Sequence, residues 1–170
     1  FSDDRYAMAI KELLEKHAAD LAPALQLSPR AAGDAIQTLL SAECRAVLGD
    51  ICAEYSSDFA RRAMADWAFT DTDGFYLVVD VKTHRLDTAF NMPNLVSVER
   101  LSRFYEDERN YFVVLLVKYA AATIQEVLFV PIEHLAWDCL TIGALGWGQI
   151  QIANASRIVV DLSLTRRDWM

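Results

Sequence analysis

The longest apolar stretches of the chain fall in its second half, separated by polar or turn-forming segments. Residues 110–119 are almost uninterrupted apolar sequence, which predicts a strand buried on both faces of a sheet. Residues 123–130, 149–153 and 157–164 are predicted to form further strands. This part of the chain is therefore expected to build a central β-sheet.

Helical spacing of apolar residues dominates the first third of the chain. Residues 3–21 form one predicted amphipathic helix. A second is expected between Ser28-Pro29, a good N-cap and first position, and Gly49, a plausible stop. Further helices are predicted at residues 50–65, 93–105 and 165–170, with a loop at 84–92. The expected fold is an α/β domain with a mixed central β-sheet flanked by helices.

Residues 65–83 carry the chemistry of a β-hairpin. Two apolar, aromatic and β-branched runs flank residues 71–74, Asp-Thr-Asp-Gly. Glycine tolerates positive φ and Asp can bond back to its own backbone, so this segment predicts the turn. A loop of two or four residues would bring Asp66 opposite Val79, Asp80 or Val81.

The hairpin is expected to gather three charged side chains. Side chains alternate along a strand, so Asp80 and Lys82 share one face. Opposed residues on antiparallel strands lie roughly 4.5 to 5.5 Å apart, so Asp66 can join them. A carboxylate and a lysine two residues apart are also typical of the solvated face of a half-buried sheet.

Two carboxylates and a lysine suit a magnesium site for phosphodiester hydrolysis. Mg²⁺ takes few protein oxygens and keeps several waters, which leaves room for a phosphate oxygen. Asp66 and Asp80 are the expected metal ligands, with the Val81 carbonyl completing the shell, and Lys82 is expected to assist the attacking water. Mn²⁺ is an expected substitute for Mg²⁺, and Ca²⁺ is expected to support binding without cleavage.

Asp66 followed by Asp80-Val81-Lys82 resembles the signature of the PD-(D/E)xK nuclease superfamily. Residues 79–83, 93–94 and 149–151, with flanking segments 30–34 and 165–169, are similar in order to type II restriction endonucleases of its EcoRV-like branch. The resemblance spans about residues 30–170 and leaves residues 1–27 outside its clearest part. It implies a single nuclease domain with the restriction-endonuclease fold.

The resemblance also implies an activity and partners. The expected protein is a Mg²⁺-dependent homodimer that cuts double-stranded DNA at a short palindromic or near-palindromic site and leaves 5′-phosphate ends. A repair or junction-resolving nuclease of the same superfamily is the first alternative. A non-catalytic interaction module that keeps the fold is the second.

The resemblance places DNA contacts in two loops. In the first, Phe90 or Met92 would wedge into a base step near Asn94; Phe90 as a core residue under the loop is an equal alternative. The second is glycine-rich, and its expected DNA-contacting residues are Ala144, Gly146, Trp147 and Gln149. A plain glycine-rich turn leading into a strand competes with that interpretation.

One position departs from the family pattern. Where relatives carry a Phe-Glu pair on the helix spanning residues 28–49, this chain carries Ile36-Gln37, so an accessory acid is missing there. Asp34, one turn earlier, is a weak substitute and is expected to be merely solvated. His134 beside Glu133 is expected to form an ordinary surface pair.

Composition limits the other possibilities. The length of 170 residues fits one domain, and 54% hydrophobic content fits buried strands or a subunit interface. A net charge of −8 argues against a general nucleic-acid-coating protein, although a local basic cleft is expected from Lys82, His84, Arg85, Arg100 and Arg103. No membrane segment or signal peptide is evident. Three scattered cysteines favour a reducing, cytoplasmic location.

Overall fold

The computed structural model describes residues 4–57, 64–88, 93–144, 148–153 and 158–170. Its helices are α1 (Asp4–Lys16), α2 (Ala18–Leu27), α3 (Pro29–Leu48), α4 (Val98–Phe104) and α5 (Arg166–Trp169). Its strands are β1 (Cys52–Ser56), β2 (Trp67–Asp71), β3 (Tyr76–Arg85), β4 (Asn94–Ser97), β5 (Asn110–Ala120), β6 (Thr123–Pro131), β7 (Leu140–Gly143) and β8 (Gln149–Ile152).

Two sheets organise the described part of the chain. The larger has five strands in the order β1-β2-β3-β5-β6, and the smaller has three in the order β4-β8-β7. In the larger sheet β3 and β5 run parallel, while the other neighbouring pairs are antiparallel. The predicted α/β class with a mixed central sheet flanked by helices is therefore confirmed.

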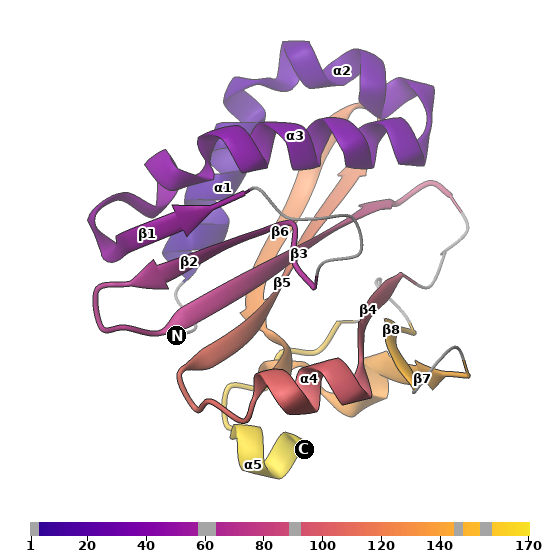
Figure 1. Ribbon diagram of the computed structural model, residues 1–170. Helices are drawn as coiled ribbons and strands as arrows, with labels where there is room; N and C mark the ends of the chain where they lie inside the picture. The colour runs from indigo at the N-terminus through magenta and orange to yellow at the C-terminus, as the bar shows by residue number, and fades with distance from the viewer. Residues whose placement is uncertain (1–3, 58–63, 89–92, 145–147, 154–157) are drawn as a thin grey trace.

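The central sheet is covered on both faces (Figure 1). Helices α1 to α3 lie on one face, while α4, α5 and the small sheet lie on the other. Alternation along β3 serves both layers: Leu77 and Val79 pack with the helices α1 to α3, and Val78 packs in the second core. Strand β5 is buried along most of its length, as its apolar sequence predicts.

Helix α3 begins and ends where its sequence predicts. The Ser28 hydroxyl accepts a hydrogen bond from the amide of Ala31 at 3.1 Å, and Pro29 occupies the first turn. Gly49 ends the helix with φ at 58°, a conformation that side chains disfavour. The predicted single helix at residues 3–21 is instead two, because α1 ends at Lys16 and α2 begins at Ala18.

The predicted helix at residues 50–65 is wrong where the structure describes it. A short 3₁₀ turn (Gly49–Ile51) leads into β1, which pairs antiparallel with β2. Tyr55 lies with its ring 5.8 Å from that of Trp67, and its hydroxyl donates to the carbonyl of Ser41 at 2.9 Å. Pairing with a distant strand overrides the helical spacing of the local sequence.

The predicted helix at residues 93–105 begins later than expected. Asn94 to Ser97 form β4, with Leu95 and Val96 buried, and Ser97 caps α4 by accepting from the amide of Arg100. The predicted loop at 84–92 is also shorter, because β3 continues through Arg85.

The C-terminal segment confirms one prediction and corrects another. Thr165 and Asp168 form a reciprocal capping box that starts α5, as the predicted helix at 165–170 requires. The described part of the predicted strand at 157–164 is not a strand. Only a single bridge joins Val160 to Leu135, and Asp161 then accepts from the amide and hydroxyl of Ser163 to make a turn.

No helix in the described part of the chain combines the length and apolar character that a membrane crossing requires.

Candidate metal and catalytic site

The turn between β2 and β3 sets the register in which these two strands pair. The amide of Asp71 donates to the carbonyl of Phe75, so three residues form the turn rather than the two or four considered from sequence. The Asp71 carboxylate accepts from the amides of Asp73 and Phe75 at 3.0 and 2.8 Å, and Gly74 takes φ of 81°.

This register brings the predicted charged residues together. Trp67 pairs with Val79, and the amide of Asp66 donates to the carbonyl of Val79 at 2.9 Å. Counting back one residue from that pair places Asp66 beside Asp80. Lys82 lies on the same strand face, and its Nζ contacts the Asp80 carboxylate Oδ1 at 2.7 Å. The predicted convergence of Asp66, Asp80 and Lys82 is therefore what the structure contains.

Asp66 is held by two donors from different parts of the chain. Its Oδ2 accepts from the backbone amide of Val81 at 2.6 Å, and its Oδ1 accepts from the Gln37 side-chain amide at 2.5 Å. Burial raises the pKa of Asp66, while the Val81 amide and the Lys82 charge act to lower it. Val81 thus contributes through its N–H; its carbonyl oxygen as a metal ligand stays a prediction.

Asp80 is a buried carboxylate with incomplete pairing. The residue is 7% exposed, and its Oδ2 is buried with no hydrogen-bond partner among the described residues. Burial raises the pKa of Asp80 to about 7; Lys82 acts to lower it, and the nearby Asp66 carboxylate raises it further. A buried acceptor without a donor is costly unless a ligand completes it.

These two carboxylates fit a magnesium ion. Mg²⁺ is typically held by one or two carboxylates and keeps several waters. Among the described residues no group of three His, Cys, Asp or Glu side chains is placed to hold a metal, so a cation here would rest on Asp66 and Asp80 with water. The unpaired Oδ2 of Asp80 is the atom that such a cation would satisfy.

The sequence left the role of Gln37 open, and the structure shows that this residue contacts Asp66. It lies one helical turn after Gly33, where a Cβ would stand 3.3 Å from the Thr83 hydroxyl of β3. The absence of a side chain at Gly33 lets α3 lie close to β3, which brings Gln37 to Asp66. Gln37 and Asp66 are 29 residues apart in sequence, so no local signal could have revealed their contact.

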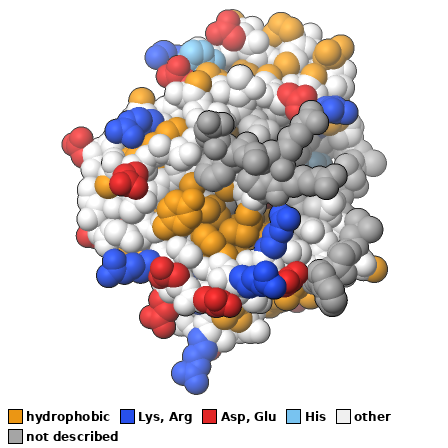
Figure 2. Space-filling model, in the orientation of Figure 1, with side chains coloured by type: hydrophobic (Ala, Val, Ile, Leu, Met, Phe, Trp, Pro, Cys, Tyr) orange, Lys and Arg blue, Asp and Glu red, His pale blue; other side chains and the backbone are white. Residues whose placement is uncertain are grey.

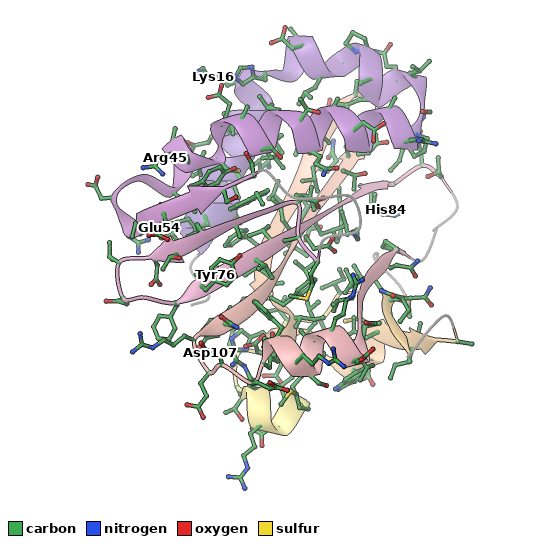
Figure 3. All side chains as sticks on the ribbon, in the orientation of Figure 1. Lys16, Arg45, Glu54, Tyr76, His84 and Asp107 are labelled. Atoms are coloured by element: carbon green, nitrogen blue, oxygen red, sulfur yellow. The ribbon has the colours of Figure 1, made fainter. Side chains whose placement is uncertain are left out.

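A groove of about 740 Å³ runs beside this site. It is lined by Ser28, Pro29, Arg30, Gly33, Asp34 and Gln37 of the α3 segment, by Val81, Lys82, Thr83, His84 and Arg85 of β3, and by Thr88 and Pro93. Figure 3 labels Tyr76 and His84, which mark the start and the far part of β3; Asp80 and Lys82 lie between them along the strand.

The groove contains only part of the expected basic cluster. Lys82, His84 and Arg85 line it, whereas Arg100 and Arg103 belong to α4. Arg85 is paired with Asp87 at 2.6 Å, and burial beside Lys118 lowers the pKa of His84. On the face shown in Figure 2, hydrophobic side chains gather near the middle and charges of both signs surround them, so this face is not broadly basic.

The expected DNA-contacting residues lie on the small sheet or outside the described residues. Asn94 is exposed at the start of β4, Gln149 begins β8, and Ala144 is exposed after β7. The predicted glycine-rich turn is therefore flanked by a strand, β7, that the sequence pattern did not predict. Phe90, Met92, Gly146 and Trp147 lie outside the described residues.

The expected surface pair of His134 with Glu133 is wrong. Glu133 is 2% exposed, and its carboxylate accepts from the Tyr105 hydroxyl at 2.7 Å and from Arg166 at 3.4 Å. The Arg166 guanidinium lies over the rings of Tyr105 and Tyr111, at 4.0 and 4.7 Å from their centroids. This cluster anchors α5 rather than forming a surface pair.

No protein-family model matches the sequence, and no curated protein matches it either.

Proposed function

We propose that this chain is a Mg²⁺-dependent nuclease, and specifically a type II restriction endonuclease of the PD-(D/E)xK superfamily. The observation that carries the proposal is the convergence of Asp66, Asp80 and Lys82, with one buried Asp80 oxygen that no described residue pairs. Structural ion pairs normally satisfy their buried oxygens, so this arrangement favours a ligand site.

The site residues would divide the chemistry between them. Asp66 and Asp80 would hold the cation, which supplies charge stabilisation for the phosphodiester transition state and an acidified water. Gln37 and the Val81 amide hold the Asp66 carboxylate in one orientation. Lys82, whose Nζ lies 2.7 Å from the Asp80 carboxylate, would orient the attacking water and offset phosphate charge once its bond to Asp80 yields to the cation.

The finer parts of the proposal rest on the sequence resemblance. These are the restriction-endonuclease fold, the homodimer, the duplex palindromic site and the 5′-phosphate ends. The mixed sheet with β3 and β5 parallel is compatible with that fold. The position of Gln37 on α3, against Asp66, supports the comparison with relatives that carry an acid there.

The test is cleavage of a long, sequenced duplex DNA in Mg²⁺, in Ca²⁺ and in EDTA. Discrete fragments are expected only with Mg²⁺, and Lys82→Ala is expected to cut roughly 10²- to 10⁴-fold more slowly because its proton-transfer or positioning role is lost. Arg85→Ala is the matched control, since Arg85 lies on the same strand and in the same groove but pairs with Asp87.

Three outcomes would contradict the proposal in different ways. Cleavage that survives Asp80→Ala and Lys82→Ala would place the activity elsewhere. Preference for branched or mismatched DNA without a fixed sequence would favour a repair or junction-resolving nuclease. Neither cleavage nor Ca²⁺-supported DNA binding would favour the non-catalytic module, which the net charge of −8 suits.

A further inference from the structure

The small sheet presents uncharged polar side chains on one face. Cross-strand pairing puts Asn94 beside Gln151 and Gln151 beside Thr141, while the alternate residues Ile150 and Ile152 are buried in the core. Pro93, the residue before Asn94, lines the groove that also contains Lys82. This polar face therefore begins next to the candidate catalytic site.

The Gln151 side chain has a defined position on this face, set by its contacts with Asn94 and Gly143. Its Nε2 donates to the Asn94 side-chain oxygen at 2.6 Å. Its amide also lies directly over Gly143 of the neighbouring strand. A Cβ added at Gly143 would stand 2.8 Å from the Gln151 Oε1, closer than real Cβ contacts allow, and 3.0 Å from its Cδ, which is tighter than most. Gly143 is not among the glycines with positive φ, so the backbone itself accepts a side chain there.

Two independent contacts thus restrict one amide. The hydrogen bond fixes the end of the Gln151 side chain, and the missing side chain at Gly143 gives it room to lie flat. The bond in turn occupies the Asn94 oxygen with a donor, and among the described residues no acceptor is bound to the Asn94 amino group, the other end of that exposed side chain.

We propose that Gln151, seated on Gly143, is a positioning residue that orients Asn94 so that its amino group contacts a hydrogen-bond acceptor on a DNA base edge. This inference rests on the proposed function and adds a specificity element to it. Side-chain amides carry no charge and gain little from phosphates compared with Lys or Arg, so a fixed amide suits base recognition. An Asn94 side chain that is free to rotate could pair with donors through its oxygen and with acceptors through its amino group. It would therefore discriminate less between base pairs.

Gly143→Ala tests directly whether the space over Gly143 holds the Gln151 side chain in place. The three atoms nearest to the added methyl group all belong to the flexible end of Gln151, so the variant is expected to fold with a melting temperature close to wild type while Gln151 is displaced. The measurement is Mg²⁺-dependent cleavage of a long, sequenced duplex, with fragment ends mapped by sequencing. Cutting at the preferred site is expected to persist. Cutting at sites that differ by one base pair is expected to rise about tenfold relative to it.

A double-mutant cycle separates this role from a general disturbance of the sheet. Gln151→Ala is expected to relax specificity as Gly143→Ala does, and Gly143→Ala is expected to add nothing in the Gln151→Ala background. Asn94→Ala is expected to make both substitutions silent. An unchanged cleavage ratio in Gly143→Ala, or an equal effect in both backgrounds, would overturn the inference while the nuclease assignment stands. Failure of the wild type to cut any DNA would overturn both.

Discussion

The buried carboxylates of Asp80 and Glu133 differ in how completely they are paired. Each is less than a tenth exposed. Glu133 has a partner at each oxygen, Tyr105 at one and Arg166 at the other. Asp80 has Lys82 at one oxygen and nothing at the other among the described residues. A fully paired carboxylate stabilises the fold, whereas a half-paired one lowers stability and leaves a place for a ligand.

Their locations match this difference. Glu133 lies in the 3₁₀ turn Ile132–His134 that follows β6, and its contact with Arg166 of α5 joins two segments more than thirty residues apart. Asp80 lies within β3 in the centre of the sheet and beside a second carboxylate. Placing two carboxylates close together opposes folding, and proteins keep such arrangements mainly where function requires them.

Neutralising Glu133 should have the largest effect on stability. Glu133→Gln keeps the shape but removes the negative charge that faces the largely buried Arg166. We expect the free energy of unfolding to fall by about 2–4 kcal/mol. Urea denaturation followed by circular dichroism measures this. A loss no larger than that of an exposed control such as Glu106→Gln would show that the cluster is not an anchor.

The same change at Asp80 should act in the opposite direction. The raised pKa shows that burial outweighs the attraction of Lys82, so Asp80→Asn should increase the free energy of unfolding by about 1–3 kcal/mol at about pH 8 without metal. Lys82 keeps Asp66 nearby as a counter-charge. The variant should also be inactive. A destabilised variant would mean that Asp80 is a structural partner of Lys82.

The pH dependence of that gain follows from linkage. Unfolded Asp80 releases its proton near its ordinary pKa of 3.8, whereas the folded protein keeps it to about pH 7. The folded state therefore binds more protons between these values, and the contribution of Asp80 to stability is lost as pH rises through this interval. Asp80→Asn and wild type should accordingly differ least near pH 4 and most above pH 7. A constant difference across this range would contradict the raised pKa.

Divalent cations should offset the loss of stability that the buried, ionised Asp80 carboxylate causes. With Ca²⁺ at about ten times its dissociation constant, the wild type should gain about 1.4 kcal/mol of stability above pH 7 without any DNA present. Thermal unfolding with and without Ca²⁺ checks this. Glu133→Gln should respond as wild type does, and Asp80→Asn should not. Equal stabilisation of all three proteins would indicate non-specific cation binding.

The smallest effect is expected from the helix contact. Gln37→Ala removes one donor from Asp66, but Gln37 is exposed and water can replace it, so stability should change by no more than about 0.5–1.5 kcal/mol. The Ca²⁺ response should weaken, because Asp66 is less firmly oriented. Asp34→Ala, on the same helix and groove, is the matched control and should leave the response intact. Identical responses in both variants would remove Gln37 from the site.

Local sequence was sufficient for the hairpin and several element ends. The turn at Asp71 to Gly74 and the Ser28 cap depend on contacts within a few residues, so residue type alone predicts them. The helix at residues 165–170 was also predicted, although its capping box was seen only in the structure. The long strands β5 and β6 were predictable because their apolar character is continuous. Convergence of Asp66, Asp80 and Lys82 followed from the hairpin and the two-residue period of a strand.

The wrong predictions share a dependence on distant partners. Tyr55 lies in β1 because β2 is available to pair with it, and Asn94 lies in β4 because Gln151 of β8 pairs with it. The segment around Val160 resembles a strand in composition, but its described residues, 158–164, form only a single bridge. In each case the pairing partner, not the local pattern, decides the conformation.

The sequence by itself determined the fold class, the turn chemistry and the three charged residues of the candidate site. These features depend on backbone preferences and side-chain alternation, which act over a few residues. Tertiary structure alone decided that Gln37 meets Asp66, that one buried Asp80 oxygen has no partner in the described part of the chain, and that Gln151 rests on Gly143. Burial and long-range contact depend on how the layers pack, and packing has no local signature in the sequence.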